Sequence, residues 1–260
     1  MTVGRPTLFL LHGFAGSPAS WDAVLAALSH PPHLCPRLAG HGEPAPGAPG
    51  VRGFEDEVDR LASLVPEGPV HLAGYSLGAR LALGLLVRHG KRFERATLIG
   101  VHPGLSSDEE RAERRRSDGA LRERLETRGI ADFVDHWERQ PLFASESRLP
   151  ETLREQKRSV RLSHDPHELA RSLALTGLAE MPDYGARAGS ISTPITLMAG
   201  ELDQKFSKLA HALAGCLPAA RVVLAPGAGH DLLLERPDLV ALTLEQQWAD
   251  RTREPLPQRA

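Results

Sequence analysis

Three residues that lie far apart in the chain have the side chains of a proton-relay triad: Ser76, Asp203 and His230. A serine hydroxyl is a weak base and nucleophile at neutral pH, and it becomes effective when an imidazole accepts its proton. A carboxylate bonded to the other ring nitrogen fixes the imidazole tautomer and stabilises the charged ring. Because each residue closely follows an apolar run, in the order serine, acid, histidine, we expect the three to converge.

Ser76 lies in the sequence Gly74-Tyr75-Ser76-Leu77-Gly78, between the apolar run 70–73 and a helical pattern. A strand that turns directly into a helix crowds its central residue, and glycines at the flanking positions make room for it. This turn would raise the serine hydroxyl above the sheet edge and aim the amide of Leu77 at the substrate. The alternative is a glycine-rich turn whose serine caps the helix. The acid and histidine that follow favour the first interpretation.

The acid and the histidine lie where later strands are expected to end. Asp203 comes just after the apolar run 195–199, and His230 ends a turn that follows the run 220–224. Glu201 and Asp231 compete for the role of the acid, and Asp203 is the better placed of the three. The carboxyl ends of parallel strands meet at one edge of a sheet, which is where ligands bind in such folds.

A second glycine-bearing loop, His12-Gly13-Phe14-Ala15-Gly16, follows the apolar run 7–11. A loop at this place can present a second backbone amide to a developing oxyanion, and we assign that amide to Phe14, beside the amide of Leu77. We interpret His12 as a buried structural histidine rather than a catalytic one.

Apolar runs and helical periodicities alternate through most of the chain, which is typical of a parallel sheet flanked by helices. Two further segments, rich in glycine or polar residues, are expected to be a surface loop at 42–53 and a frayed tail at 251–260. The expected strands are 7–11, 33–38, 70–73, 96–100, 195–199 and 220–224; the expected helices begin at Ser17-Pro18, cover 54–65, run from Ser76 to a C-cap at Gly90, cover 209–217 and begin at Pro237.

The alternation stops between residues 102 and 191, where the chain is charged and mostly helical. Most of these charges fit a solvated helix face with ion pairs between successive turns. A helical insertion after the strand that follows the Ser76 turn and its helix also lies over the carboxyl ends of the strands. There it can serve as a lid. We therefore predict one α/β domain, residues 1–260, with a helical lid at 102–191.

The composition excludes several function classes. The chain has 260 residues, with 31 basic and 33 acidic side chains and a net charge of -2, so it shows no electrostatic preference for nucleic acid or an anionic membrane. Its two cysteines, Cys35 and Cys216, rule out a disulfide framework and a cysteine-based metal site. The segment His164-Asp165-Pro166-His167 lacks a further metal ligand. No secretory signal or membrane-spanning run is evident, so we expect a cytoplasmic protein. The oligomeric state is left open.

The order of strands, helices and triad residues as a whole resembles the alpha/beta-hydrolase superfamily. More narrowly, the chain is similar to the 2-succinyl-6-hydroxy-2,4-cyclohexadiene-1-carboxylate (SHCHC) synthases of menaquinone biosynthesis, the MenH family. The similarity extends from the His12 loop to the His230 turn, with two departures: Ala79 stands where the family often has glycine, and Leu233 where it often has a second histidine. The segments that carry it are Gly74-Tyr75-Ser76-Leu77-Gly78-Ala79-Arg80, His102-Pro103-Gly104-Leu105, Gln140-Pro141-Leu142-Phe143-Ala144-Ser145 and Gly200-Glu201-Leu202-Asp203-Gln204-Lys205-Phe206.

This resemblance implies an elimination without metal or cofactor. The activated serine takes a proton from the carbon beside a succinyl ketone, and pyruvate leaves from an enolpyruvyl substituent. The implied partner is a small-molecule polycarboxylate with three carboxylates, which arginine is suited to bind. By position in the matching segments, the implied substrate contacts are Tyr75, Arg80, Arg114, Trp137 and Arg158. From spacing alone, Arg114 and Arg158 would be read as surface charges.

Two other functions fit the same triad. An esterase or carbon-carbon bond hydrolase would use it through water attack or an acyl-enzyme, and its pocket would be mostly apolar. A non-catalytic ligand-binding protein would retain the scaffold with a vestigial triad. An arginine-ringed pocket favours the elimination.

Overall fold

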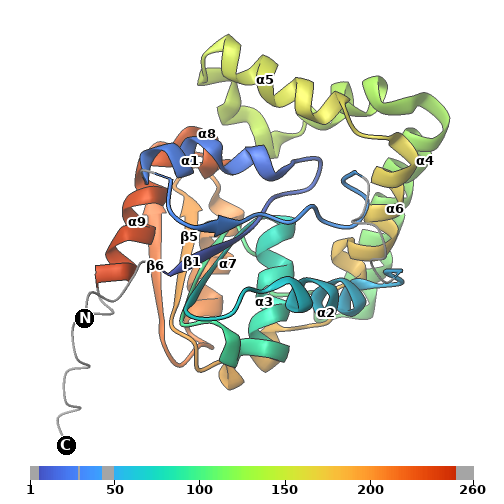
Figure 1. Ribbon diagram of the computed structural model, residues 1–260. Coiled ribbons are helices and arrows are strands. Elements are labelled where there is room, and N and C mark those ends of the chain that lie inside the picture. The colour runs from blue at the N-terminus through green and yellow to red at the C-terminus, as the bar shows by residue number, and fades with distance from the viewer. Residues whose placement is uncertain (1–5, 29, 43–49, 250–260) are drawn as a thin grey trace, which may run out of the picture.

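A computed structural model describes residues 6–28, 30–42 and 50–249 of the chain (Figure 1). Its centre is a six-stranded sheet in the order β2-β1-β3-β4-β5-β6, with every neighbouring pair parallel. This is the α/β arrangement that the alternating pattern predicts. The strands are β1 (Thr7–Leu11), β2 (His33–Leu34), β3 (Val70–Tyr75), β4 (Arg95–Ile99), β5 (Ile195–Gly200) and β6 (Ala220–Ala225).

Both faces of the sheet are covered, because successive strand side chains point to opposite faces. Phe9 and Leu11 of β1 pack in one core with α2, α3 and α7, whereas Leu8 and Leu10 pack in another with α1, α8 and α9. Figure 1 shows the second group of helices together at the left of the sheet. The helices are α1 (Asp22–Ala27), α2 (Phe54–Leu64), α3 (Leu77–His89), α4 (Asp108–Glu138), α5 (Glu151–Leu162), α6 (Pro166–Thr176), α7 (Gln204–Ala214), α8 (Leu232–Glu235) and α9 (Pro237–Ala249).

Two expected elements differ from the observed ones by more than two residues at one or both ends. The strand expected at 33–38 is only β2, since Pro36 has no N–H with which to continue the ladder. The helix expected at 209–217 is α7, which begins earlier, at Gln204, and ends at Ala214. Its start is set by Asp203, whose carboxylate accepts a hydrogen bond from the amide of Phe206.

The chain between β4 and β5 contains α4, α5 and α6 together with 3-10 turns at Pro141–Arg148, Leu178–Glu180 and Gly185–Ser190. We call residues 102–191 the helical insertion. It has a core of its own, in which Leu125, Phe133 and Val134 of α4 meet Leu169 and Leu173 of α6. In Figure 1, α5 crosses the top of the molecule, and α4 and α6 run down its right side. The glycine at position 129, with φ of +79°, interrupts the helical geometry of α4.

Two expectations concern residues that are not described: most of the loop at 42–53 and the tail at 251–260 lie outside the described ranges. Within those ranges, no helix is both long and apolar enough to cross a membrane.

Candidate active site

The turn between β3 and α3 has the strained geometry that its glycines predict. Ser76 lies between the two elements with φ of +52°, a backbone angle that residues other than glycine rarely adopt. A Cβ on Gly74 would lie 2.4 Å from the carbonyl oxygen of Gly78, and one on Gly78 would lie 2.2 Å from that of Leu11. The amide of Ser76 donates to the carbonyl of Ile99 at 2.8 Å, which anchors the turn to β4.

The structure brings the three triad candidates together at the carboxyl edge of the sheet. Nε2 of His230 lies 3.1 Å from Oγ of Ser76, and Nδ1 lies 2.7 Å from Oδ2 of Asp203. A carboxylate only accepts hydrogen bonds, so Nδ1 carries the ring proton and Nε2 is left to accept from the serine hydroxyl. The other oxygen of Asp203 caps α7, which fixes the carboxylate in place. The imidazole of His230 therefore has the tautomer and orientation that a general base for Ser76 requires.

The competing acids are occupied elsewhere. Glu201 accepts a hydrogen bond from the amide of Gly227 at 2.8 Å. Asp231 pairs with Lys157, whose Nζ lies 2.5 Å from Oδ2. Geometry thus selects Asp203 as the partner of His230, as its place at the end of β5 suggests.

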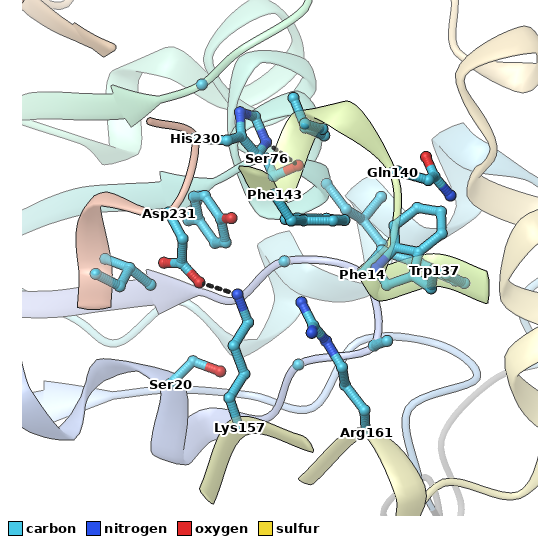
Figure 2. Close-up of a pocket in the computed structure, with 18 of the residues that line it drawn as sticks. Phe14, Ser20, Ser76, Trp137, Gln140, Phe143, Lys157, Arg161, His230 and Asp231 are labelled. Carbon is cyan, nitrogen blue, oxygen red and sulfur yellow. Dashed lines mark hydrogen bonds and ion pairs between the residues drawn. The ribbon is translucent and has the colours of Figure 1, made fainter. Parts of the chain in front are cut away.

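A cavity of about 760 Å³ lies above Ser76 and His230, between the sheet edge and the helical insertion. Phe14 and Leu77, the two residues expected to supply oxyanion amides, both line it. Leu77 is the first residue of α3, where an amide has no acceptor within the helix. Figure 2 shows Phe14 and Trp137 on one side of the cavity and His230 with Ser76 on another. The cavity can therefore hold a substrate against the serine and beside the two residues that are expected to supply the oxyanion amides.

Positive charge gathers on one wall of this cavity. Arg80, His102, Arg114 and Lys205 all line it. Burial, together with the neighbouring charge of Arg114, lowers the pKa of Arg80 to about 9. Burial and the charges of Lys205, Arg80 and Arg114 lower the pKa of His102 to about 4. His102 therefore stays neutral at pH 7, while Arg80, Arg114 and Lys205 give this wall a positive potential that an anion would relieve.

The two arginines of this wall are held differently. Arg80, on the first turns of α3, donates from Nη1 to the carbonyl of Thr176 in α6 at 2.9 Å. Arg114, on α4, donates from Nε to Asp118 at 2.9 Å. The insertion thus supplies a partner for each guanidinium group at the cavity, and their remaining N–H groups, which have no acceptor in the described part of the chain, can meet a ligand carboxylate.

The two aromatic candidates also line the cavity. The ring of Tyr75 lies 5.5 Å from that of His230, and burial raises the pKa of its hydroxyl well above the ordinary value, so it stays protonated. Trp137 packs against Phe14 at 5.3 Å and stacks on Phe133 at 5.6 Å. Its indole N–H is buried and has no acceptor among the described residues, which leaves a donor for a ligand.

Arg158 is the candidate that the structure places elsewhere. Its guanidinium pairs with Asp135 and with Glu138 of α4, and the residue is not part of the cavity lining. The expectation of a direct substrate contact is therefore not supported by the geometry. Its neighbours on α5, Lys157 and Arg161, line the cavity instead, and Figure 2 shows both extending from α5 into it.

Sequence reasoning missed Lys157 and Arg161, although the signal was present. The basic residues of α5 recur at steps of three and four, at 154, 157, 158 and 161, so they form one basic stripe along a single helix face. Arg161 is only 4% exposed, donates to Glu138 at 3.0 Å and lies over the ring of Phe143 at 5.1 Å. Such burial is unusual for an arginine on a solvated face.

No group of three or more possible metal ligands occurs within the described residues. Of the segment at 164–167, Asp165 caps α6 by accepting a hydrogen bond from the amide of Glu168 at 2.9 Å. Ala79 and Leu233, where the sequence departs from the family pattern, are both buried. Ala79 is fully buried, and Leu233 is 1% exposed and lines the cavity.

Comparison with known proteins agrees with this geometry. A family model described as alpha/beta hydrolase family matches residues 8–242. A protein of Bacillus subtilis (strain 168) named as a putative SHCHC synthase is 34% identical over 233 residues, which cover 88% of this chain and 85% of that protein. An SHCHC synthase of Enterobacter sp. (strain 638) is 35% identical over 246 residues, covering 94% and 92% of the two chains.

A solved structure extends the likeness to the backbone. The structure of MenH from S. aureus superposes with a TM-score of 0.91 at 28% identity, and the match covers 96% of each chain. Because the match spans nearly the whole chain, it includes the helical insertion as well as the sheet.

Proposed function

This chain belongs to the alpha/beta hydrolase family, and within that family we propose that it is an SHCHC synthase. In this reaction, 2-succinyl-5-enolpyruvyl-6-hydroxy-3-cyclohexene-1-carboxylate loses pyruvate and becomes SHCHC, a step of menaquinone biosynthesis. The names of the relatives support this reaction, and so does the likeness to MenH over the full chain.

One observation of the site carries the proposal: a triad-activated serine opens into a cavity lined by arginine and lysine side chains. A substrate with three carboxylates needs such a wall, whereas an ordinary ester does not. Arg80 and Arg114 are the groups best placed to bind carboxylates, because planar guanidinium forks match carboxylate oxygens. Arg161 of α5 adds a buried positive charge to the cavity lining.

The first step is removal of a carbon-bound proton. Nε2 of His230 takes the hydroxyl proton of Ser76, and the serine oxygen takes the proton from the ring carbon beside the succinyl ketone. Asp203 stabilises the imidazolium that results. An activated base of this kind is worth roughly 10²- to 10⁴-fold in rate. The negative charge moves onto the ketone oxygen as an enolate.

The amides of Phe14 and Leu77 are assigned to that oxygen as an oxyanion hole. Each donor in an oxyanion hole raises kcat by roughly 10²- to 10³-fold. Collapse of the enolate forms the diene and breaks the bond between the enolpyruvyl oxygen and the ring carbon that carries it. The leaving enolpyruvate regains one proton, which the imidazolium of His230 can return, and becomes pyruvate. Atoms and electrons balance without a further reactant, since one molecule divides into two.

The helical insertion supports the reaction in two ways. It supplies Arg114, Trp137 and Arg161 to the cavity wall, and it covers the carboxyl edge of the sheet. We propose that residues 102–191 act as a lid that excludes water from the enolate, which would otherwise be protonated or solvated. Activity in the cytoplasm, without metal or cofactor, remains a prediction of the sequence.

The test is release of pyruvate from this substrate by the purified protein, followed through NADH oxidation by lactate dehydrogenase. We expect turnover without added metal, and a loss of at least about 10²-fold in kcat for Ser76→Ala. Ser63→Ala is a matched control, because Ser63 is exposed on α2 and bonds only to its own helix in the structure. It should keep the wild-type rate.

A short-chain aryl ester, assayed beside the natural substrate, tests the alternative. Hydrolysis of the ester with no release of pyruvate would replace the elimination by an esterase function. Wild-type pyruvate release by Ser76→Ala would show that the assigned base is wrong.

A further inference from the structure

Two histidines outside the triad are fully buried beside the loop that carries Phe14. His12 lies in that loop, and His41 lies in the loop that follows β2. Each side chain accepts from a backbone amide near the other histidine: the amide of Leu38 donates to Nε2 of His12 at 3.3 Å, and the amide of Ala15 donates to Nε2 of His41 at 3.0 Å. The rings meet edge to face at 5.1 Å. The contact is thus reciprocal and joins two loops that are distant in sequence.

The tautomer of each ring follows from its second nitrogen. Nδ1 of His12 lies 2.9 Å from the carbonyl oxygen of Gly13, and Nδ1 of His41 lies 3.1 Å from that of Ala39. A carbonyl accepts and cannot donate, so both Nδ1 atoms carry hydrogen and both Nε2 atoms are acceptors. Burial lowers the pKa of His12 to about 4 and that of His41 well below its ordinary value, which keeps the rings neutral.

These bonds hold both peptide planes on either side of Phe14. The carbonyl of Gly13 and the amide N–H of Phe14 belong to one planar unit and point in opposite directions. The bond from His12 to that carbonyl, together with the one that the amide of Gly16 donates to the same oxygen at 3.1 Å, therefore sets the direction of the Phe14 N–H. On the other side, the bond from Ala15 to His41 fixes the next peptide unit. It does so at a residue with φ of +54°, a conformation that a residue with a Cβ does not hold unaided.

Surrounding rings keep water away from this contact. Phe14 packs edge to face on His41 at 5.6 Å, and His164 of the insertion does the same at 5.5 Å. A hydrogen bond shielded in this way has no water to replace it if one partner is removed. Both imidazoles therefore contribute to holding the orientation of the Phe14 amide.

We propose that His12 and His41 are positioning residues that aim the amide of Phe14 at the oxyanion of the reaction, by holding the two peptide planes that flank it. This inference rests on the proposed role of Phe14 in the function above. It assigns no contact with substrate to either histidine.

The test compares replacements that keep or remove one hydrogen bond. In His41→Gln the side-chain oxygen can take the place of Nε2 and accept from Ala15, whereas in His41→Leu nothing can. We expect His41→Leu to lower kcat by about 10- to 100-fold, because a displaced donor forfeits most of its effect, with KM changed much less. His41→Gln should recover most of the loss.

His71→Leu is the matched control. His71 is also a buried histidine, but it bonds Thr97 within the sheet, at the opposite end of β3 from Ser76. A role that is merely structural would make His41→Leu and His71→Leu behave alike, each losing thermal stability with kcat retained. That result would overturn the proposal.

His12 supplies a second comparison, which stands even if His41→Leu fails to fold. The amide nitrogen of His12→Asn can donate to Gly13 in place of Nδ1, whereas His12→Gln can only replace the bond to Leu38. We expect the asparagine variant to retain about tenfold more kcat than the glutamine variant. Equal rates, or the reverse order, would contradict the assignment.

A third measurement separates this inference from the proposed reaction. Amide hydrogen exchange of a peptide covering residues 12–20 should rise in His41→Leu and stay low in His41→Gln and His71→Leu, whichever substrate the enzyme turns over. If the wild-type protein released no pyruvate but hydrolysed the aryl ester, the proposed function would fail, and kcat for the ester would replace it as the readout. Unchanged exchange in folded His41→Leu would overturn the positioning role itself.

Discussion

Replacing Lys157 by methionine is expected to destabilise the protein, because it leaves two buried carboxylates without their shared partner. Nζ of Lys157 lies 2.5 Å from Oε1 of Glu146 and 2.5 Å from Oδ2 of Asp231. Figure 2 shows the pair with Asp231. The side chains of the three residues are 16%, 11% and 5% exposed. The ammonium therefore joins two parts of the insertion to the residue that follows His230.

The magnitude follows from this burial. Removing one partner of a buried ion pair costs about 3–5 kcal/mol. We take the lower end, about 3 kcal/mol, because Arg161 remains 3.9 Å from Glu146 and offsets part of the charge. For a domain of this size, each kcal/mol lowers Tm by about 2–4 °C, so Lys157→Met should lose about 6–12 °C at pH 7.

The pH dependence gives a sharper test. In the folded protein, burial alone would raise the pKa of Asp231, and the charges of Lys157 and Arg161 lower it below the ordinary value. Its contribution to stability is present above the unfolded pKa and is lost as the pH falls through the folded one. Burial outweighs Lys157 at Glu146 and raises the pKa of that carboxyl. Without the ammonium both pKa values rise, so a proton can replace the lost charge as the pH falls.

The stability lost in Lys157→Met should therefore be largest near neutral pH and shrink toward about pH 5. Thermal unfolding of variant and wild type at both pH values measures it. Lys208→Met is the control, because Lys208 is exposed on α7 and such changes stay within about 0.5 kcal/mol. A fall in Tm of less than about 1 °C at pH 7, or an equal fall at both pH values, would refute the electrostatic reasoning.

Three further changes test the site. Gly100→Ala would place a Cβ 2.8 Å from Cε1 of His230, at a residue with φ of +61°, so we expect kcat to fall by about 10²-fold while the folded state persists by circular dichroism. Asp203→Asn should lower kcat by about 10³- to 10⁴-fold with little change in KM, because the imidazole loses its tautomer and charge partner; a milder loss would point to another acid. Arg114→Ala should raise KM about tenfold, and Arg158→Ala, whose charge is used by α4, should leave KM unchanged; equal effects would argue against the cavity as described.

The sequence by itself determined the parallel α/β sheet of the protein and the three residues that meet at its edge. Gly74 and Gly78 indicated the strained turn at Ser76, since no side chain fits where their hydrogens lie. Asp203 and His230 could be placed because strands of a parallel sheet end at one edge, and the residues after them must meet there. These signals are local or follow from topology, so they can be read before any packing is known.

Only the tertiary structure decided which cations face the cavity. Arg158 and Arg161 lie on the same helix, one turn apart, and nothing in their local sequence separates them. Both arginines pair with Glu138 of α4, but Arg158 also pairs with Asp135 and lies outside the cavity lining, whereas Arg161 lines the cavity. The reciprocal bonds of His12 and His41 were hidden for the same reason, since they join loops whose separation is set by packing. Periodicity specifies the faces of an element, but the direction that each face takes depends on its distant neighbours.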